Sequence, residues 1–117
     1  MRQPPSIDAY GDGGFRVSGQ RHEGSLLILG DEPRAWSGRR LADLTPDDFA
    51  EVLAARAVVE FVLLGTGAVQ ALPPRPVREA LRAAGIGLEF MSTETAARTY
   101  NVLASEGRRL AAALIAV

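Results

Sequence analysis

Two long apolar runs, residues 58–64 and residues 110–117, limit most strongly the folds that this chain can adopt. The first is interrupted only by Glu60 and has the length of a strand, which indicates a strand covered on both faces. The second is rich in Ala and could form a helix by propensity alone. Its uninterrupted apolar character and the preceding Gly107 favour a buried last strand instead.

The other segments predict hairpins first and helices afterwards. Turn residues at 11–14, 19–24 and 30–33 separate the short runs 15–18 and 25–29, a spacing typical of antiparallel hairpins. Thr45 and Pro46 predict the start of one helix, and Pro76 predicts the start of a second that Gly85 ends. Residues 86–90 alternate like a strand. The expected fold is a mixed sheet covered by helices.

A third helix is predicted after Ser92 or Thr93, either of which can cap it. Glu94 and Arg98 lie four residues apart and are expected to pair on its solvent side, and Gly107 can stop the helix. One face of this helix is predicted to pack in the core, and it holds Ala96, Ala97, Tyr100, Leu103 and Ala104.

Length and composition predict one domain, residues 1–117, with no strong attraction to nucleic acid or acidic lipid. Apolar residues make up 47% of the chain and charged residues 23%, and the formal charge is −1. All 13 cations are Arg, which we attribute to a GC-rich genome. The chain has no Cys and no N-terminal secretory signal, and residues 110–117 are far shorter than the roughly 20 residues of a membrane helix. We therefore expect a cytoplasmic bacterial protein without direct membrane insertion.

Several sequence motifs together resemble a domain family of unknown biochemical function. Its eukaryotic relatives include mitochondrial NADH dehydrogenase (complex I) assembly factor 3 and an adipogenesis-associated Mth938 domain-containing protein. The resemblance covers nearly the whole chain and is most specific between Met91 and Arg108. It rests on Ile7, Asp8, Ala9, Tyr10, Phe15, Gly24, Ser25, Trp36, Leu64, Gly65, Thr66 and Gly67, and on residues 91–93, 96–103 and 106–108.

This resemblance implies a single Mth938-like α/β domain with three layers, built on N-terminal β-hairpins, a central mixed sheet and about three helices. It also implies that the last strand is antiparallel, and that no enzymatic activity is established for the family. His22 departs from the family pattern, in which Tyr is frequent at this place. It is therefore a poor candidate for a site that the whole family shares.

The segment Gly65, Thr66, Gly67 directly follows a buried strand, a place where glycines can let backbone N–H groups approach an anion. Against this interpretation, Gln70 stands where the third glycine of a dinucleotide-binding loop would be, and the chain has no Lys for a P-loop. The alternative is a purely structural exit from the strand. Carboxyl ends of strands at a switch in sheet order nevertheless hold the ligands of many α/β domains.

Isolated polar residues have simpler explanations than catalysis. His22 is expected to be an exposed residue of a hairpin turn, without partners for a triad or a metal site. Asp47 and Asp48 are expected to complement a helix dipole. Glu60 is expected either at the end of the sheet or buried with an Arg partner.

Two interpretations remain open for the polar residues around the third helix. In the structural one, Thr93 caps the helix, Asn101 bonds a neighbouring loop and Glu106 pairs with an Arg. In the functional one, the start of the helix meets the Gly65 loop and Met91 in one groove, because adjacent parallel strands bring their carboxyl ends to one edge. The predicted binding residues are Gly65, Thr66, Gly67, Met91, Thr93, Arg98, Asn101, Glu106 and Arg108. No catalytic residue, metal ligand or cofactor is predicted.

Three functions follow in order of preference. The first is a non-catalytic accessory or assembly domain that binds a protein partner. The resemblance implies a partner in a respiratory or membrane complex. The second is a small-molecule or anion-binding domain that uses the edge at Gly65, Thr66 and Gly67. The third is an enzyme that uses Thr93, Tyr100 or Arg98. The sequence names neither the partner nor the oligomeric state.

Overall fold

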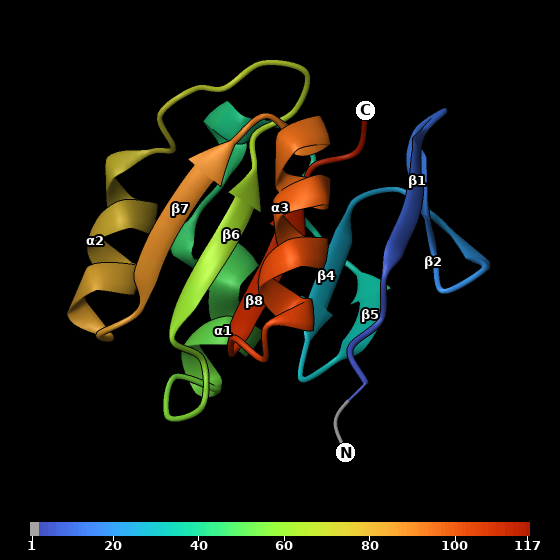
Figure 1. Ribbon diagram of the computed structural model, residues 1–117. Coiled ribbons are helices and arrows are strands. Elements are labelled where there is room, and N and C mark those ends of the chain that lie inside the picture. The colour runs from blue at the N-terminus through green and yellow to red at the C-terminus, as the bar shows by residue number, and fades with distance from the viewer. Residues whose placement is uncertain (1–2) are drawn as a thin grey trace.

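The N-terminal part of the chain forms a small antiparallel sheet of β1 (Ile7–Gly11), β2 (Gly14–Val17) and β3 (Gln20–Glu23) (Figure 1). The computed structural model describes residues 3–117. Two-residue turns join these strands, at Asp12 and Gly13 and at Ser18 and Gly19, with a positive φ at each position. Turns of this kind match the twist of the paired strands. The predicted hairpins are therefore confirmed.

His22 is a strand residue, so its predicted place in an exposed turn is wrong. It lies in β3, half-buried, and pairs with Phe15 of β2 across the ladder. The two positive-φ residues Ser18 and Gly19 already complete the turn, and the chain extends again from Gln20. A two-residue turn thus leaves His22 inside the sheet.

A five-stranded sheet forms the centre of the molecule, in the order β5-β4-β8-β6-β7. Its strands are β4 (Leu26–Leu29), β5 (Glu32–Ala35), β6 (Phe61–Gly65), β7 (Gly87–Met91) and β8 (Leu110–Leu114). The sheet is mixed, as predicted, because β6 runs parallel to both β7 and β8 whereas β4 is antiparallel to β5 and β8. The last strand is therefore antiparallel to β4 only, and the expectation of an antiparallel last strand has to be corrected for its other neighbour, β6.

The first apolar run enters the sheet later than its sequence indicates. β6 begins at Phe61, because the backbone N–H groups of Val58 and Val59 still bond to Ala55 at the end of the preceding helix. Val58 is 59% exposed. Glu60 lies just before the strand and pairs with Arg108 and Arg109 at 3.5 and 3.7 Å, which agrees with the expected Arg contact at the end of the sheet.

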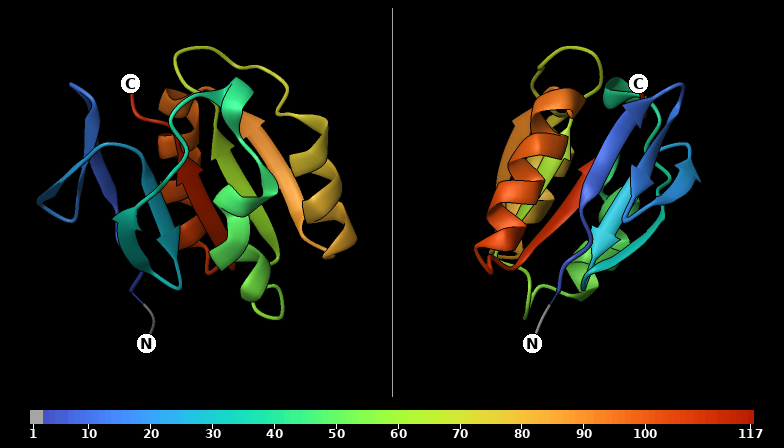
Figure 2. Two further views of the ribbon diagram at one scale, coloured as in Figure 1. Left: turned by 180° about the vertical axis from the view of Figure 1, so that it is seen from behind. Right: turned by 45° about the vertical axis from the view of Figure 1, so that its right-hand side comes forward.

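Helices cover both faces of the five-stranded sheet. α3 (Thr93–Ser105) lies over one face (Figure 1), whereas α1 (Ala50–Ala54) and α2 (Arg75–Ala83) lie over the other (Figure 2). The buried side chains form two clusters accordingly: Tyr100 packs with Phe15 of the small sheet on the α3 side, and Val52 packs with Leu81 on the far side. Alternate residues of β8 belong to alternate clusters. This arrangement gives the predicted three layers.

Helix boundaries differ slightly from the sequence prediction. Thr45 begins a 3-10 helix, η2 (Pro46–Phe49), before α1, and the Thr45 N–H donates to the Asp48 carboxylate at 2.9 Å in a capping box. A second 3-10 helix, η1 (Leu41–Asp43), was not predicted. α2 begins at Arg75, one residue before Pro76. The predicted core face of α3 is confirmed, with Leu103 only half-buried.

Candidate functional site

The carboxyl ends of β6 and β7 meet the start of α3. The Thr66 N–H donates to the Met91 carbonyl at 2.8 Å, and the Thr93 N–H donates to the Gly67 carbonyl at 2.8 Å. The end of β8 joins them, because the Ile115 N–H donates to the Gly65 carbonyl at 3.0 Å. Figure 1 shows this junction at the arrowheads of β6 and β7. Five of the nine predicted binding residues, Gly65, Thr66, Gly67, Met91 and Thr93, therefore lie together.

Thr93 connects three segments at this junction from a fully buried position. Its hydroxyl donates to the Ile115 carbonyl at 2.8 Å and accepts the Gly67 N–H at 3.0 Å. Thr93 is the first residue of α3, and Ser92 is its N-cap, accepting the Thr95 N–H at 3.4 Å. The interpretation of Thr93 as the cap is therefore wrong.

Gly65 lets α3 approach the sheet closely. A Cβ atom at this position would lie 2.9 Å from the Thr93 hydroxyl oxygen and 3.0 Å from a methyl group of Leu114. Real Cβ atoms essentially never make contacts shorter than 3.0 Å, so a side chain here would push the helix away. Close packing explains why a glycine stands here.

Internal hydrogen bonds occupy the loop after β6. The N–H groups of Thr66 and Gly67 donate to Met91 and Thr93, as described above. The Thr66 hydroxyl donates to the Val69 carbonyl at 2.6 Å and lies 3.1 Å from the Met91 carbonyl oxygen. In this conformation, those two N–H groups bind protein oxygens and are not directed at an external anion.

Asn101 binds a strand rather than a loop. Its side-chain oxygen accepts the Ile7 N–H at 2.8 Å, and its side-chain nitrogen donates to the Ile7 carbonyl at 2.9 Å. The amide group therefore joins α3 to β1 by bonding both the N–H and the carbonyl of one residue, as a neighbouring strand does in a sheet. This contact spans 94 positions in the sequence.

Arg98 is exposed on the outer side of α3. Its guanidinium donates to the Glu94 carboxylate at 2.7 Å, which confirms the predicted pair. Hydrogen bonding to Tyr10 first, and the charge of Glu94 second, raise the pKa of Arg98 above its ordinary value. The guanidinium therefore pairs with Glu94 and has Tyr10 as a second neighbour.

Glu106 and Arg108 lie at the other end of α3. The helix has 13 residues, so its two ends are about 20 Å apart. Glu106 is the C-cap residue, and Arg108 pairs with Glu60 and stacks over the Phe61 ring at 4.9 Å. The nine predicted residues therefore lie in separate places, at the two ends of α3 and along its length.

Two neighbours of Arg98, Tyr10 and Val102, were not among the predicted binding residues. Tyr10 packs against α3 from the small sheet, and Val102 follows Arg98 by one helical turn with 56% of its surface exposed. Val102 could have been found as a large apolar residue outside the core face of α3. Tyr10 could not, because nothing in the sequence places β1 beside this helix.

Clusters that could hold a metal ion are absent from the described part of the chain, where His, Asp and Glu form no group of three or more. Within residues 3–117, no helix combines the length and apolar character that a membrane span needs.

Comparison with known proteins gives the same boundaries as the fold. A family model described as "Protein of unknown function (DUF498/DUF598)" matches residues 7–115. An uncharacterized protein of Rhodobacter capsulatus is 44% identical over 93% of this chain and 82% of its own length. Human NADH dehydrogenase (ubiquinone) 1 alpha subcomplex assembly factor 3 is 34% identical over 93% of this chain. The aligned region spans 59% of the human protein.

Solved structures share the fold. The crystal structure of an outer membrane protein from Bartonella henselae superposes with a TM-score of 0.90 at 37% identity, covering 97% of this chain and 96% of that one. The solution structure of a Bordetella pertussis protein, described as a Mth938-like domain, superposes with a TM-score of 0.79 at 29% identity. It covers 98% of this chain and 90% of the other. The predicted Mth938-like fold is confirmed.

Proposed function

We propose that this chain, which belongs to the DUF498/DUF598 family of proteins of unknown function, is a non-catalytic accessory domain that binds a protein partner. The observation that carries this proposal is the similarity to the human assembly factor over 93% of this chain. The name of that relative says that it assembles NADH dehydrogenase, so the expected partner of this chain is a component of a respiratory or membrane complex. Because this chain spans 59% of that relative, its partner need not be the same protein.

We infer that the partner binds the outer side of α3, at Tyr10, Arg98 and Val102, which we call the α3 surface. Glu94, Arg98 and Val102 are spaced by four residues and share one side of the helix. Tyr and Arg are enriched in protein interfaces, where a planar donor beside apolar surface gives both burial and directed hydrogen bonds. Of the nine predicted binding residues, Arg98 belongs to this surface, whereas Thr93 and Asn101 have internal partners.

Affinity purification with a matched control tests this proposal. The chain offers a matched control, because Arg75 and Glu79 on α2 form the same kind of exposed pair, at 2.7 Å and four residues apart, as Arg98 and Glu94. The baits are the unchanged protein, Arg98→Ala and Arg75→Ala. We expect Arg75→Ala to retain the specific partner and Arg98→Ala to lose it, with similar melting curves for all three.

A purified pair then measures the interaction directly by calorimetry. Arg98→Ala is expected to weaken the affinity about tenfold, as for the loss of a charge-assisted contact in an interface. Equal affinities for Arg98→Ala and Arg75→Ala would show that the partner binds elsewhere. Failure of the unchanged protein to retain any partner reproducibly would contradict the accessory role itself.

A binding site for an anion or small molecule at Gly65, Thr66 and Gly67 is the second candidate. It ranks lower because the N–H groups of Thr66 and Gly67 already have internal acceptors. Titration with inorganic phosphate, followed by the amide NMR signals of these residues, would reveal such a site by saturable shifts. An enzyme based on Thr93, Tyr100 or Arg98 ranks last, because the side chains of Thr93 and Tyr100 are buried.

A further inference from the structure

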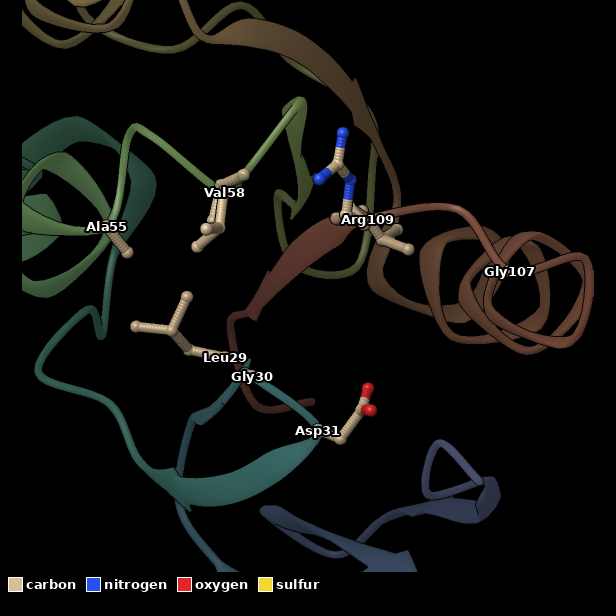
Figure 3. A pocket seen from close by; sticks show the side chains of 9 residues that line it. Leu29, Gly30, Asp31, Ala55, Val58, Gly107 and Arg109 are labelled. Carbon is tan, nitrogen blue, oxygen red and sulfur yellow. The ribbon is translucent and has the colours of Figure 1, made fainter. Parts of the chain in front are cut away.

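An apolar cavity of about 500 Å³ opens at the end of the five-stranded sheet where β6 and β8 begin (Figure 3). Three connections surround it: the turn between β4 and β5, the segment between α1 and β6, and the segment between α3 and β8. Ligand sites in proteins commonly have volumes of about 300–1,000 Å³. The cavity therefore has the capacity for a small molecule.

The walls of this cavity are hydrocarbon. Val59 and Leu110 are nearly buried and continue into the two cores of the molecule, while Leu29 and Ala55 are half-buried. Val58 remains 59% exposed although it lies beside them. A hydrocarbon chain in the cavity would remove these surfaces from water, which is favourable in proportion to the apolar area covered.

Arg109 is the cationic residue of the cavity lining, and its backbone is fixed by a hydrogen bond whereas its side chain makes only a long contact with Glu60. The Arg109 carbonyl accepts the Glu60 N–H at 2.8 Å, which fixes the backbone of Arg109 just before β8. Its guanidinium lies 3.7 Å from the Glu60 carboxylate, and the Arg109 side chain is 63% exposed. A guanidinium has five donors, so it can bind a second carboxylate without losing this contact.

The charges are unevenly placed around the cavity. Figure 3 shows Leu29 and Val58 on one side, with the head groups of Arg109 and Asp31 on the other and separated from each other. Asp31 is a carboxylate that offers only acceptor atoms, so Arg109 is the residue of the lining whose side chain can bind an anionic head group. A ligand with a single carboxylate matches the single guanidinium of the lining.

We propose that this cavity binds an amphipathic monocarboxylate, with its hydrocarbon chain against Leu29, Val58 and Leu110 and its carboxylate at Arg109. Hydrocarbon walls select the tail, and the guanidinium selects the head group over a neutral or cationic one. This binding does not depend on the protein partner proposed above, because the cavity and the α3 surface share no residue.

Titration of the ¹⁵N-labelled protein with octanoate, below its micelle concentration, tests the proposal. Octan-1-ol and octyltrimethylammonium serve as probes with the same chain and a neutral or cationic head. We expect octanoate to give saturable shifts at the amides of Gly30, Gly107 and Leu110, and the other two probes to bind at least fivefold more weakly. Binding of octanoate should also weaken as salt is added.

Variants separate the head group from the tail. Arg109→Gln is expected to weaken octanoate binding about five- to tenfold, since it removes a charge-assisted contact. Arg56→Gln makes the same change of charge near the cavity without altering its lining, and should bind octanoate within twofold of the unchanged protein. Val58→Ser should weaken all three probes alike, because it reduces the apolar wall.

Equal binding of the three probes, together with no effect of Arg109→Gln, would mean that the cavity is only an apolar surface, as a side chain of a protein partner would use. That result would overturn the proposal. Shifts confined to other parts of the molecule, or shifts that do not saturate, would overturn it as well.

Discussion

The hydroxyl of Thr93 lies where the end of β6, the start of α3 and the end of β8 come together, and it bonds to two neighbouring segments. The sequence identifies Ser92 and Thr93 as equivalent candidates for a cap, because they are neighbours and both carry a hydroxyl group that can accept a backbone N–H. Their actual roles differ because Thr93 is buried and Ser92 is half-exposed. That difference depends on the tertiary position of the helix, which local sequence does not encode.

Replacing Thr93 by Val should destabilise the protein by about 1–3 kcal/mol, because it leaves the Gly67 N–H and the Ile115 carbonyl without a buried partner. Thr95→Val makes the same change two residues later on an exposed position and should cost about 0.5 kcal/mol or less. Urea unfolding curves of both variants measure these differences. Similar stabilities for the two would mean that the Thr93 hydroxyl contributes no more than a surface group.

α3 is the element that the sequence describes best, because burial repeats along a helix with a period that can be read directly. Its core face was predicted correctly at Ala96, Ala97, Tyr100 and Ala104. Asn101 was predicted to bond a nearby loop, but its partner Ile7 belongs to a strand near the other end of the chain. Periodicity tells which side of a helix is covered, but it does not tell which element covers it.

Asn101→Ala should loosen the small sheet while the five-stranded sheet stays intact. The change removes both hydrogen bonds to Ile7, each worth about 1 kcal/mol. Hydrogen exchange followed by mass spectrometry should show faster exchange in β1, with little change in β6 and β8.

Ser105→Ala is the control for this experiment, because the Ser105 hydroxyl bonds only within its own helix, to the Val102 carbonyl. It should leave the exchange of β1 unchanged. Uniformly faster exchange in every strand of Asn101→Ala would show that the small sheet and the central sheet open together, contrary to this expectation.

At the scale of the whole molecule, the sequence predicts the layers but not the order of the strands. Residues 110–117 were recognised as a buried strand from their apolar character. The position of β8 between β4 and β6, antiparallel to the first and parallel to the second, follows from pairing across the sheet. The separation of Thr93 from Glu106 follows from the predicted length of the helix, whereas the contact of Asn101 with β1 does not follow from the local sequence.

Removal of residues 110–117 should prevent folding, because it takes away the strand that joins β5-β4 to β6-β7. It also removes Leu114 and Ala113 from the centres of the two cores. We expect loss of the near-ultraviolet circular dichroism signal and of dispersed amide NMR signals. A chain that lacks residues 1–5, which precede β1, should keep both. A cooperative unfolding transition in the shorter C-terminal variant would contradict the central role of β8.

The position of β8 also has a consequence for folding during synthesis on the ribosome. A ribosome releases the N-terminal segments first, so β4 and β6 emerge while the strand that must pair with both is still unmade. Until β8 has emerged as well, each of these strands has an open edge that can pair with another chain. The two halves of the central sheet, β5-β4 and β6-β7, therefore join only when β8 is available, and their edges need shielding until then.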